Sequence, residues 1–145
     1  MRLDLRAPLF YLKFPASEEK ELIYSFPEDD EMLLCYELNP KESRSIEPDM
    51  TRFLGSLIYA GRKLKKDAVN KEPAFSQEVC LPQGVYLFVQ QRSDRALNKN
   101  EWLEMAIEQH KDCLWERCNP GDLLYVRFLY EDHSYVTQLF RPAGS

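Results

Sequence analysis

Short stretches of this chain alternate or cluster apolar and aromatic residues in the manner of β-strands. The N-terminal third predicts three such strands, each ended by proline or acidic residues: 8–15, 20–27 and 31–38. The stretch 39–49 contains two prolines and no period, so it predicts a loop.

Two other stretches repeat apolar residues at helical spacing. The first is 50–66, where Asp49 is suited to cap the helix and the apolar stripe consists of Phe53, Leu54, Leu57, Ile58 and Leu64. The second is 98–115, where Asn98 and Glu101 form a variant of the capping box and an Asn-Pro-Gly sequence follows the helix. A basic cluster at 62–66 is interpreted as the solvated end of the first helix, with a phosphate-binding patch as the alternative.

Four further strands complete the expected fold: 75–81, 85–90, 123–130 and 134–140. The Pro-Gln-Gly sequence at 82–84 predicts a turn between the first two, and the last two predict a hairpin. The resulting order is β-β-β-α-β-β-α-β-β. It predicts an α+β fold, an antiparallel sheet with two helices on one face, built from two strand–helix–strand–strand modules. Two helices cover only one face, so we expect the other face to be concave and available to a ligand.

Composition narrows the class of protein. The chain has 145 residues, which predicts a single domain over 1–145. Its hydrophobic content of 44% and charged content of 30% are typical of a soluble globular protein. The net charge of −5 argues against nucleic acid and anionic membranes as partners. No apolar run is long enough to span a bilayer, no signal-peptide pattern is present, and the four cysteines form no CxxC motif, so we expect a cytoplasmic protein.

The sequence contains no recognisable catalytic motif. It has two histidines and neither lies in a GxSxG or HExxH pattern. His110 falls on the inner stripe of the second helix, where a core histidine is a simpler interpretation than a general base. His110, Cys113 and Cys118 lack a fourth ligand and the usual zinc spacing, so we expect no metal and no cofactor.

Aromatic residues in the predicted strands are the main candidates for a binding site. Alternate strand residues share a face, which groups Tyr86 with Phe88, Tyr125 with Arg127, and places Gln138 among apolar neighbours. One interpretation is an ordinary aromatic core; the other is an aromatic pocket with a few polar groups that orient a ligand. The candidate ligand-binding residues are Gln138, Tyr86, Phe88, Tyr125, Arg127, Tyr36 and Trp102.

The C-terminal two-thirds resembles a known family. The sequence LPQGVYLF at 81–88 resembles the turn and strand of gyrase-inhibitor-like, bacterial effector-binding domains, and TQLFRP at 137–142 resembles their terminal strand. The resemblance extends over about residues 50–142 and implies two strand–helix–strand–strand modules around a central groove that binds small, often cationic or aromatic compounds. The family's ligand-contacting glutamate falls on Gln138, whose amide forms hydrogen bonds but does not neutralise a cation.

The expected function is therefore a stand-alone, non-catalytic domain that binds a small-molecule effector in an aromatic groove. The alternative is a protein-interaction or inhibitor module. A third hypothesis is a small hydrolase-like enzyme that pairs Tyr125 or Tyr130 with Glu131 or Glu37.

Overall fold

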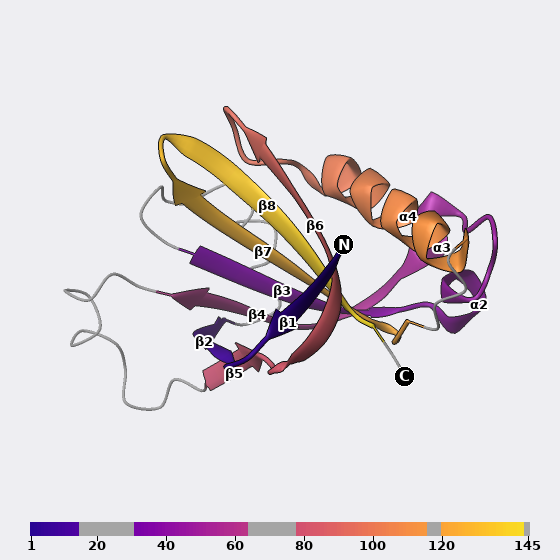
Figure 1. The fold of residues 1–145 in the computed structure, drawn as a ribbon, viewed down its shortest axis with the longest axis horizontal. Helices are drawn as coiled ribbons and strands as arrows, with labels where there is room; N and C mark the ends of the chain where they lie inside the picture. Colours follow the sequence, from indigo (N-terminus) through magenta and orange to yellow (C-terminus); the bar gives the residue numbers. More distant parts are fainter. Residues whose placement is uncertain (15–30, 64–77, 116–119, 144–145) are drawn as a thin grey trace.

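A computed structural model describes residues 1–14, 31–63, 78–115 and 120–143 (Figure 1). Its elements, in chain order, are β1 (Arg2–Leu5), β2 (Leu9–Phe14), β3 (Glu31–Leu38), α2 (Pro40–Ser43), α3 (Met50–Phe53), β4 (Leu54–Lys63), β5 (Glu78–Leu81), β6 (Gly84–Ser93), α4 (Lys99–Trp115), β7 (Leu123–Glu131) and β8 (Ser134–Pro142). Among the helices in these ranges, none is both long and apolar enough to cross a membrane.

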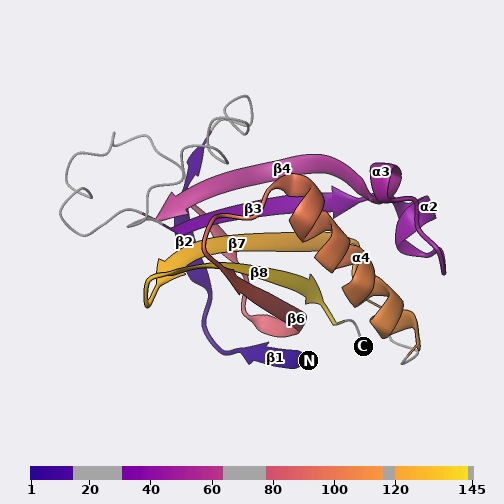
Figure 2. The ribbon, with the colours of Figure 1, turned by 90° about the horizontal axis from the view of Figure 1, so that it is seen from above.

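All eight strands form one antiparallel sheet in the order β1-β6-β8-β7-β3-β4-β2-β5. The ends of this order are close along the chain. Only Pro82 and Gln83 separate β5 from β6, although β5 pairs with β2 at one end and β6 pairs with β1 at the other. The sheet is therefore curled into a half-barrel, and α4 crosses its outer face (Figure 2).

Each face of the curled sheet carries its own apolar core, because side chains alternate along every strand. The interior of the curl holds a cluster rich in tyrosine: Tyr11, Leu33, Cys35, Leu81, Tyr86, Tyr125 and Phe140. The outer face packs against α4 through a second cluster that includes Leu34, Tyr36, Leu38, Trp102, Val126 and Leu139. Burial of both faces is the main source of stability for the fold.

The fold class is confirmed, but the expected order of helices and strands is matched only in part. The structure has an α+β fold with a mostly antiparallel sheet, and strands overlap the predicted ranges 8–15, 31–38, 75–81, 85–90, 123–130 and 134–140, whereas β1 was not predicted. Asn98 and Glu101 form reciprocal hydrogen bonds at the start of α4, as the capping box predicted. The last hairpin turns at Asp132 and His133, both at positive φ. The predicted strand at 20–27 lies outside the described residues.

The prediction of a helix over 50–66 is wrong. Asp49 does cap a helix, through a hydrogen bond from the Thr51 amide, but that helix (α3) ends at Phe53. The chain continues as β4, which lies between β3 and β2. Arg62 and Lys63 of the basic cluster are therefore the last residues of a strand and not part of a helix end, and residues 64–66 lie outside the described residues.

Two irregularities in the β3–β4 pairing explain the helix-like pattern. The register shifts between Cys35 and Tyr36 and again between Tyr36 and Leu38, and each shift adds one residue to β4. The extra residues put Leu54, Leu57 and Ala60 on the same side of the sheet at intervals of three. An interval of three apolar residues is also the signature of a helix, so the sequence pattern predicted the wrong element.

The expected arrangement of helices is wrong as well. Among the described residues only α4 is long; α2 and α3 are single turns, and α2 lies in the stretch 39–49 that was predicted to be a loop. With β4 in place of a helix, the chain does not contain two strand–helix–strand–strand modules. Nor do β5 and β6 pair with each other across 82–84, because the chain bends there from one end of the sheet to the other.

A buried polar contact ties α4 to β8 and to the segment after β3. Arg141 is 2% exposed, and its guanidinium donates to Nδ1 of His110 at 2.7 Å. Arginine only donates, so Nδ1 is the acceptor and Nε2 carries the proton that it donates to the Ser45 carbonyl at 2.7 Å. Burial and the nearby Arg141 charge lower the pKa of His110, so the imidazole is neutral in the folded protein.

We expect Gly61→Ala to destabilise the protein by about 1–3 kcal/mol, because a Cβ atom at this position has no space. It would lie 2.7 Å from Cβ of Tyr11 and 2.9 Å from Cγ2 of Val79. Urea denaturation provides the measurement. Ser56→Ala, at an exposed position of the same strand, is the control and should change little. An unchanged midpoint for Gly61→Ala would argue against β4 at this position.

The neutral state of His110 predicts that stability falls at acidic pH. In the unfolded chain the histidine has a pKa near 6.5, whereas its pKa in the folded protein is lower. The contribution of His110 to the free energy of unfolding is therefore complete above pH 6.5 and is lost as the pH falls below that value. The limiting slope for one proton is about 1.4 kcal/mol per pH unit. His110→Gln preserves a donor and an acceptor but does not titrate. Denaturation of both proteins from pH 7.5 to 5 should show a steeper loss for the wild type, and equal slopes would contradict the assignment.

Candidate functional site

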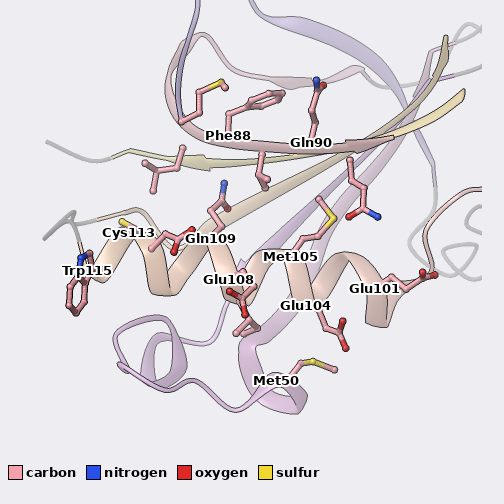
Figure 3. Close-up of a pocket in the computed structure, with 16 residues that line it drawn as sticks. Met50, Phe88, Gln90, Glu101, Glu104, Met105, Glu108, Gln109, Cys113 and Trp115 are labelled. Carbon is pink, nitrogen blue, oxygen red and sulfur yellow. The ribbon is translucent and has the colours of Figure 1, made fainter. Parts of the chain in front are cut away.

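A groove of about 970 Å³ runs between α4 and β6 (Figure 3). Apolar side chains line much of it, among them Met1, Met50 and Met105, whose flexible side chains adapt readily to different partners. One end is closed where Leu87 of β6 packs with Cys113 of α4. The groove is thus bounded by one strand and one helix that the fold holds in fixed positions.

The contribution of β6 shows that the groove follows the edge of the sheet. Five consecutive residues, from Leu87 to Gln91, line it. Consecutive side chains of a strand point to opposite faces, so a cavity that contacts all five has to wrap around a strand edge. The pairing explains why: β1 covers β6 only from Gly84 to Leu87, and Met1 accepts one more hydrogen bond from the Phe88 amide. Beyond Phe88, no described strand pairs with β6 on that side.

The contribution of α4 is strongly acidic. Four carboxylates lie along one side of the helix and line the groove: Glu101, Glu104, Glu108 and Asp112. None of the described residues that line the groove is basic. Glu101 already forms a bidentate ion pair with Arg95, at 2.6 and 2.8 Å. The structure gives Glu104, Glu108 and Asp112 no ion pair with any described residue. Three carboxylates at four-residue intervals therefore line the groove without an ion pair to a described residue, and Glu104 and Glu108 project from the side of α4 that is turned away from β6 (Figure 3).

Two further side chains of α4 are left available for a ligand. Gln109 projects from the helix towards β6 (Figure 3), and both polar atoms of its amide are buried with no hydrogen-bond partner among the described residues. A buried amide without a partner is costly, so a site that supplied one would recover the lost hydrogen bonds. Trp115 lies at the lip of the groove with 89% of its surface exposed. An exposed tryptophan beside carboxylates is suited to contact a cation.

Two of the predicted ligand-binding residues meet in a different place. Inside the curl, Arg127 donates to Gln138 at 2.8 Å, to Glu31 at 2.9 Å and to the Tyr11 hydroxyl at 3.0 Å. Gln138 then donates to Gln90 at 3.0 Å. The network satisfies the polar groups of Arg127 and Gln138 within the protein, which identifies it as a structural element of the curled sheet.

The other predicted residues are divided between the two cores. Tyr86 and Tyr125 are buried inside the curl, with their rings 6.0 Å apart and the Tyr86 hydroxyl bonded to the Pro82 carbonyl. Tyr36 and Trp102 pack together under α4 at 5.6 Å. Phe88 packs on Phe140 and is the only one of the seven predicted residues that lines the groove. The aromatic groove expected from the sequence is therefore not assembled from these residues.

Two candidate reactive groups inside the curl, a thiol and a phenol, are unreactive at neutral pH. Burial raises the pKa of the Cys35 thiol to about 11, and a protonated, buried thiol is inert. Burial also raises the pKa of Tyr125, which is surrounded by Cys35, Cys80 and Tyr86, so this phenol does not act as a base near neutral pH.

Metal-binding geometry is not found in the described residues, where no group of three or more His, Cys, Asp or Glu could hold an ion. Both nitrogens of His110 are already used in hydrogen bonds. Cys118 lies outside the described residues, so the third member of the His-Cys-Cys sequence is not placed.

The groove residues were not singled out from the sequence, although one signal was present. Glu104, Glu108 and Asp112 recur at four-residue intervals within the predicted helix at 98–115, which places them on one side. That pattern is common on solvated helix faces. Its significance depends on β6 lying opposite, and this contact is a property of the tertiary fold.

Comparison with known proteins identifies no relative: no family model matches the chain, and no curated protein matches it in sequence. The resemblance to effector-binding domains stays a prediction from two short motifs.

The Arg127 network predicts that this arginine is needed for stability. Its side chain is 16% exposed and that of Glu31 is 26% exposed. Arg127→Met leaves a mostly buried carboxylate without its cation, and we expect a loss of about 3 kcal/mol in the free energy of unfolding. Arg92→Met removes an ion pair to Glu131 that is exposed on both sides, and should cost under about 1 kcal/mol. Equal effects of the two substitutions on urea denaturation would contradict this assignment.

Proposed function

We propose that this protein is a non-catalytic binding domain, and that the groove between α4 and β6 holds a positively charged ligand with an apolar part. The observation that carries the proposal is the charge of the groove: Glu104, Glu108 and Asp112 line it, and none of the described residues that line it is basic. Like charges held in one groove repel one another, and a cationic ligand would relieve that repulsion.

The rest of the groove supports a ligand that is more than a simple ion. Apolar side chains line the groove, the buried amide of Gln109 has no described hydrogen-bond partner, and the ring of Trp115 is exposed at the end of α4. A ligand with cationic and apolar groups would contact all three. The proposal keeps the binding function expected from the sequence and moves the site from the inside of the curl to its outer edge.

Binding is favoured over catalysis by the chemistry of the same residues. Apart from the buried thiol of Cys113, the titratable side chains of α4 that line the groove are carboxylates, and Glu104 and Glu108 are exposed to solvent. The tyrosine–glutamate enzyme hypothesis receives no support at Tyr125, which is inside the curl among apolar neighbours and thiols.

The proposal predicts that a small aromatic cation binds in a charge-dependent manner. Benzyltriethylammonium is a suitable probe, with benzenesulfonate as the anionic counterpart. The triple variant E104Q/E108Q/D112N should weaken its binding at least tenfold, a change of about 1.4 kcal/mol, in isothermal titration. Added salt should weaken binding to the wild type.

A matched control separates the groove from the overall charge. The variant E37Q/E47Q/E78Q changes three exposed carboxylates outside the groove, so both triple variants change the net charge from −5 to −2. Only the groove variant should lose affinity. Trp102 is fully buried and Trp115 is exposed, so a shift in tryptophan emission would report the groove. Equal losses in both variants, or no binding of the cation, would overturn the proposal.

A further inference from the structure

The buried side of α4 changes character along the helix. The turns up to Ile107 pack on the sheet as part of the outer apolar core. Beyond them, the buried residues of the helix are His110, which is 0% exposed, and Cys113, which is 3% exposed. Cys113 belongs to a small separate cluster with Leu87 and Ala143. The position of the second half of α4 therefore depends strongly on His110.

His110 joins α4 to two other parts of the fold. Its Nε2–H donates to the Ser45 carbonyl in the segment after α2, and its Nδ1 accepts from Arg141 of β8, both at 2.7 Å. The imidazole also lies edge-on to the ring of Phe53 in α3, with centroids 5.4 Å apart. The Arg141 guanidinium lies over the same ring at 5.9 Å and donates to the Gly121 carbonyl at 3.0 Å. The arrangement requires a neutral imidazole, because Nδ1 has to accept a hydrogen bond.

The surroundings of this pair do not stabilise a second positive charge. The titratable and charged groups around His110 are Arg141 and two groups near that arginine, Cys113 of α4 and Asp122 before β7. The Asp122 carboxylate already accepts from the Ser43 hydroxyl of α2 at 2.9 Å. The segment after α2 and α3 present a backbone carbonyl and an aromatic ring, and neither titrates. Protonation of His110 would therefore place two buried cations side by side and remove the acceptor of the guanidinium.

We infer that His110 and Arg141 form an acid-sensitive latch, which holds the second half of α4 against β8 at neutral pH and releases it, opening the groove, when His110 is protonated. Gln109 and Cys113, on either side of His110 along the helix, both line the groove, and the contact of Cys113 with Leu87 closes one end. Release of this half of α4 separates them from β6. The consequence for ligand binding rests on the proposed function: a ligand held in the closed groove and a proton on His110 oppose each other.

The expected size of the effect follows from one proton. In the released form His110 is in contact with solvent and its pKa is near 6.5, whereas its pKa in the latched form is lower. The form that binds the proton is favoured as the pH falls. The ratio of released to latched protein should therefore rise about tenfold between pH 7.5 and pH 5.5.

Labelling of Cys113 with N-ethylmaleimide tests the release, because this thiol is buried while α4 is latched. Mass spectrometry of tryptic peptides resolves it from Cys118, since Arg117 lies between them. The labelling rate of Cys113 in the wild type, divided by its rate in His110→Gln at the same pH, should rise about tenfold from pH 7.5 to pH 5.5. The comparison at equal pH removes the pH dependence of the reagent. His133→Gln changes the exposed histidine of the last hairpin and should behave as the wild type.

Cys35 distinguishes release of α4 from unfolding of the whole chain. It is 1% exposed inside the curl, on the side of the sheet that α4 does not cover. At pH 5.5 Cys113 of the wild type should react at least about tenfold faster than Cys35, a comparison that needs no variant. Equal rates for the two thiols would mean that only global unfolding exposes Cys113. That result, or a wild-type to His110→Gln ratio that does not change with pH, would overturn the latch.

The link to the groove is tested with benzyltriethylammonium, whose charge does not depend on pH. At ten times its dissociation constant it should slow the labelling of Cys113 at pH 5.5 about tenfold, because a ligand of the latched form opposes release. A bound cation that leaves the labelling rate unchanged would overturn the link between the latch and the groove. If the cation does not bind at any pH, the proposed function fails, while the two thiol comparisons still decide whether the latch exists.

Discussion

The bend between β5 and β6 is the constraint on which the rest of this structure depends. Pro82 and Gln83 carry the chain from the strand beside β2 to the strand beside β1, so the ends of the sheet are held close together and the sheet has to curl. Curling closes one face into an interior that tyrosines fill, and turns the other face outward, where α4 covers it. The strand β6 extends past the end of β1, so its unpaired part lies beside α4.

The structure separates its polar groups into two kinds. Arg127, Glu31 and Gln138 inside the curl, and Arg141 with His110 under α4, are matched to one another with hydrogen bonds near 2.8 Å. A buried set of this kind stabilises the fold only when it is complete. The carboxylates and the Gln109 amide of the groove are not matched in this way within the described part of the chain. Polar groups without partners are those that a ligand would contact, so the groove is a better candidate for a binding site than the inside of the sheet.

Local patterns predicted the elements whose residues obey a single period. Short apolar and aromatic runs identified β3, β7 and β8, and the capping residues Asn98 and Glu101 identified α4. The prediction failed at β4, where two added residues replaced alternation by intervals of three. It failed also at the site. The groove is created by the approach of α4 to β6, and neither segment contains information about the other in its own sequence pattern.

The acidic side of α4 has a consequence for how copies of this protein meet. An uncovered strand edge is the usual starting point for self-association, since two such edges can pair with each other. Pairing of β6 with β6 of a second copy would bring two acidic α4 helices closer together, and the repulsion between their carboxylates opposes the contact. The charges that would attract a cationic ligand thus also work against pairing of this strand edge with a second copy.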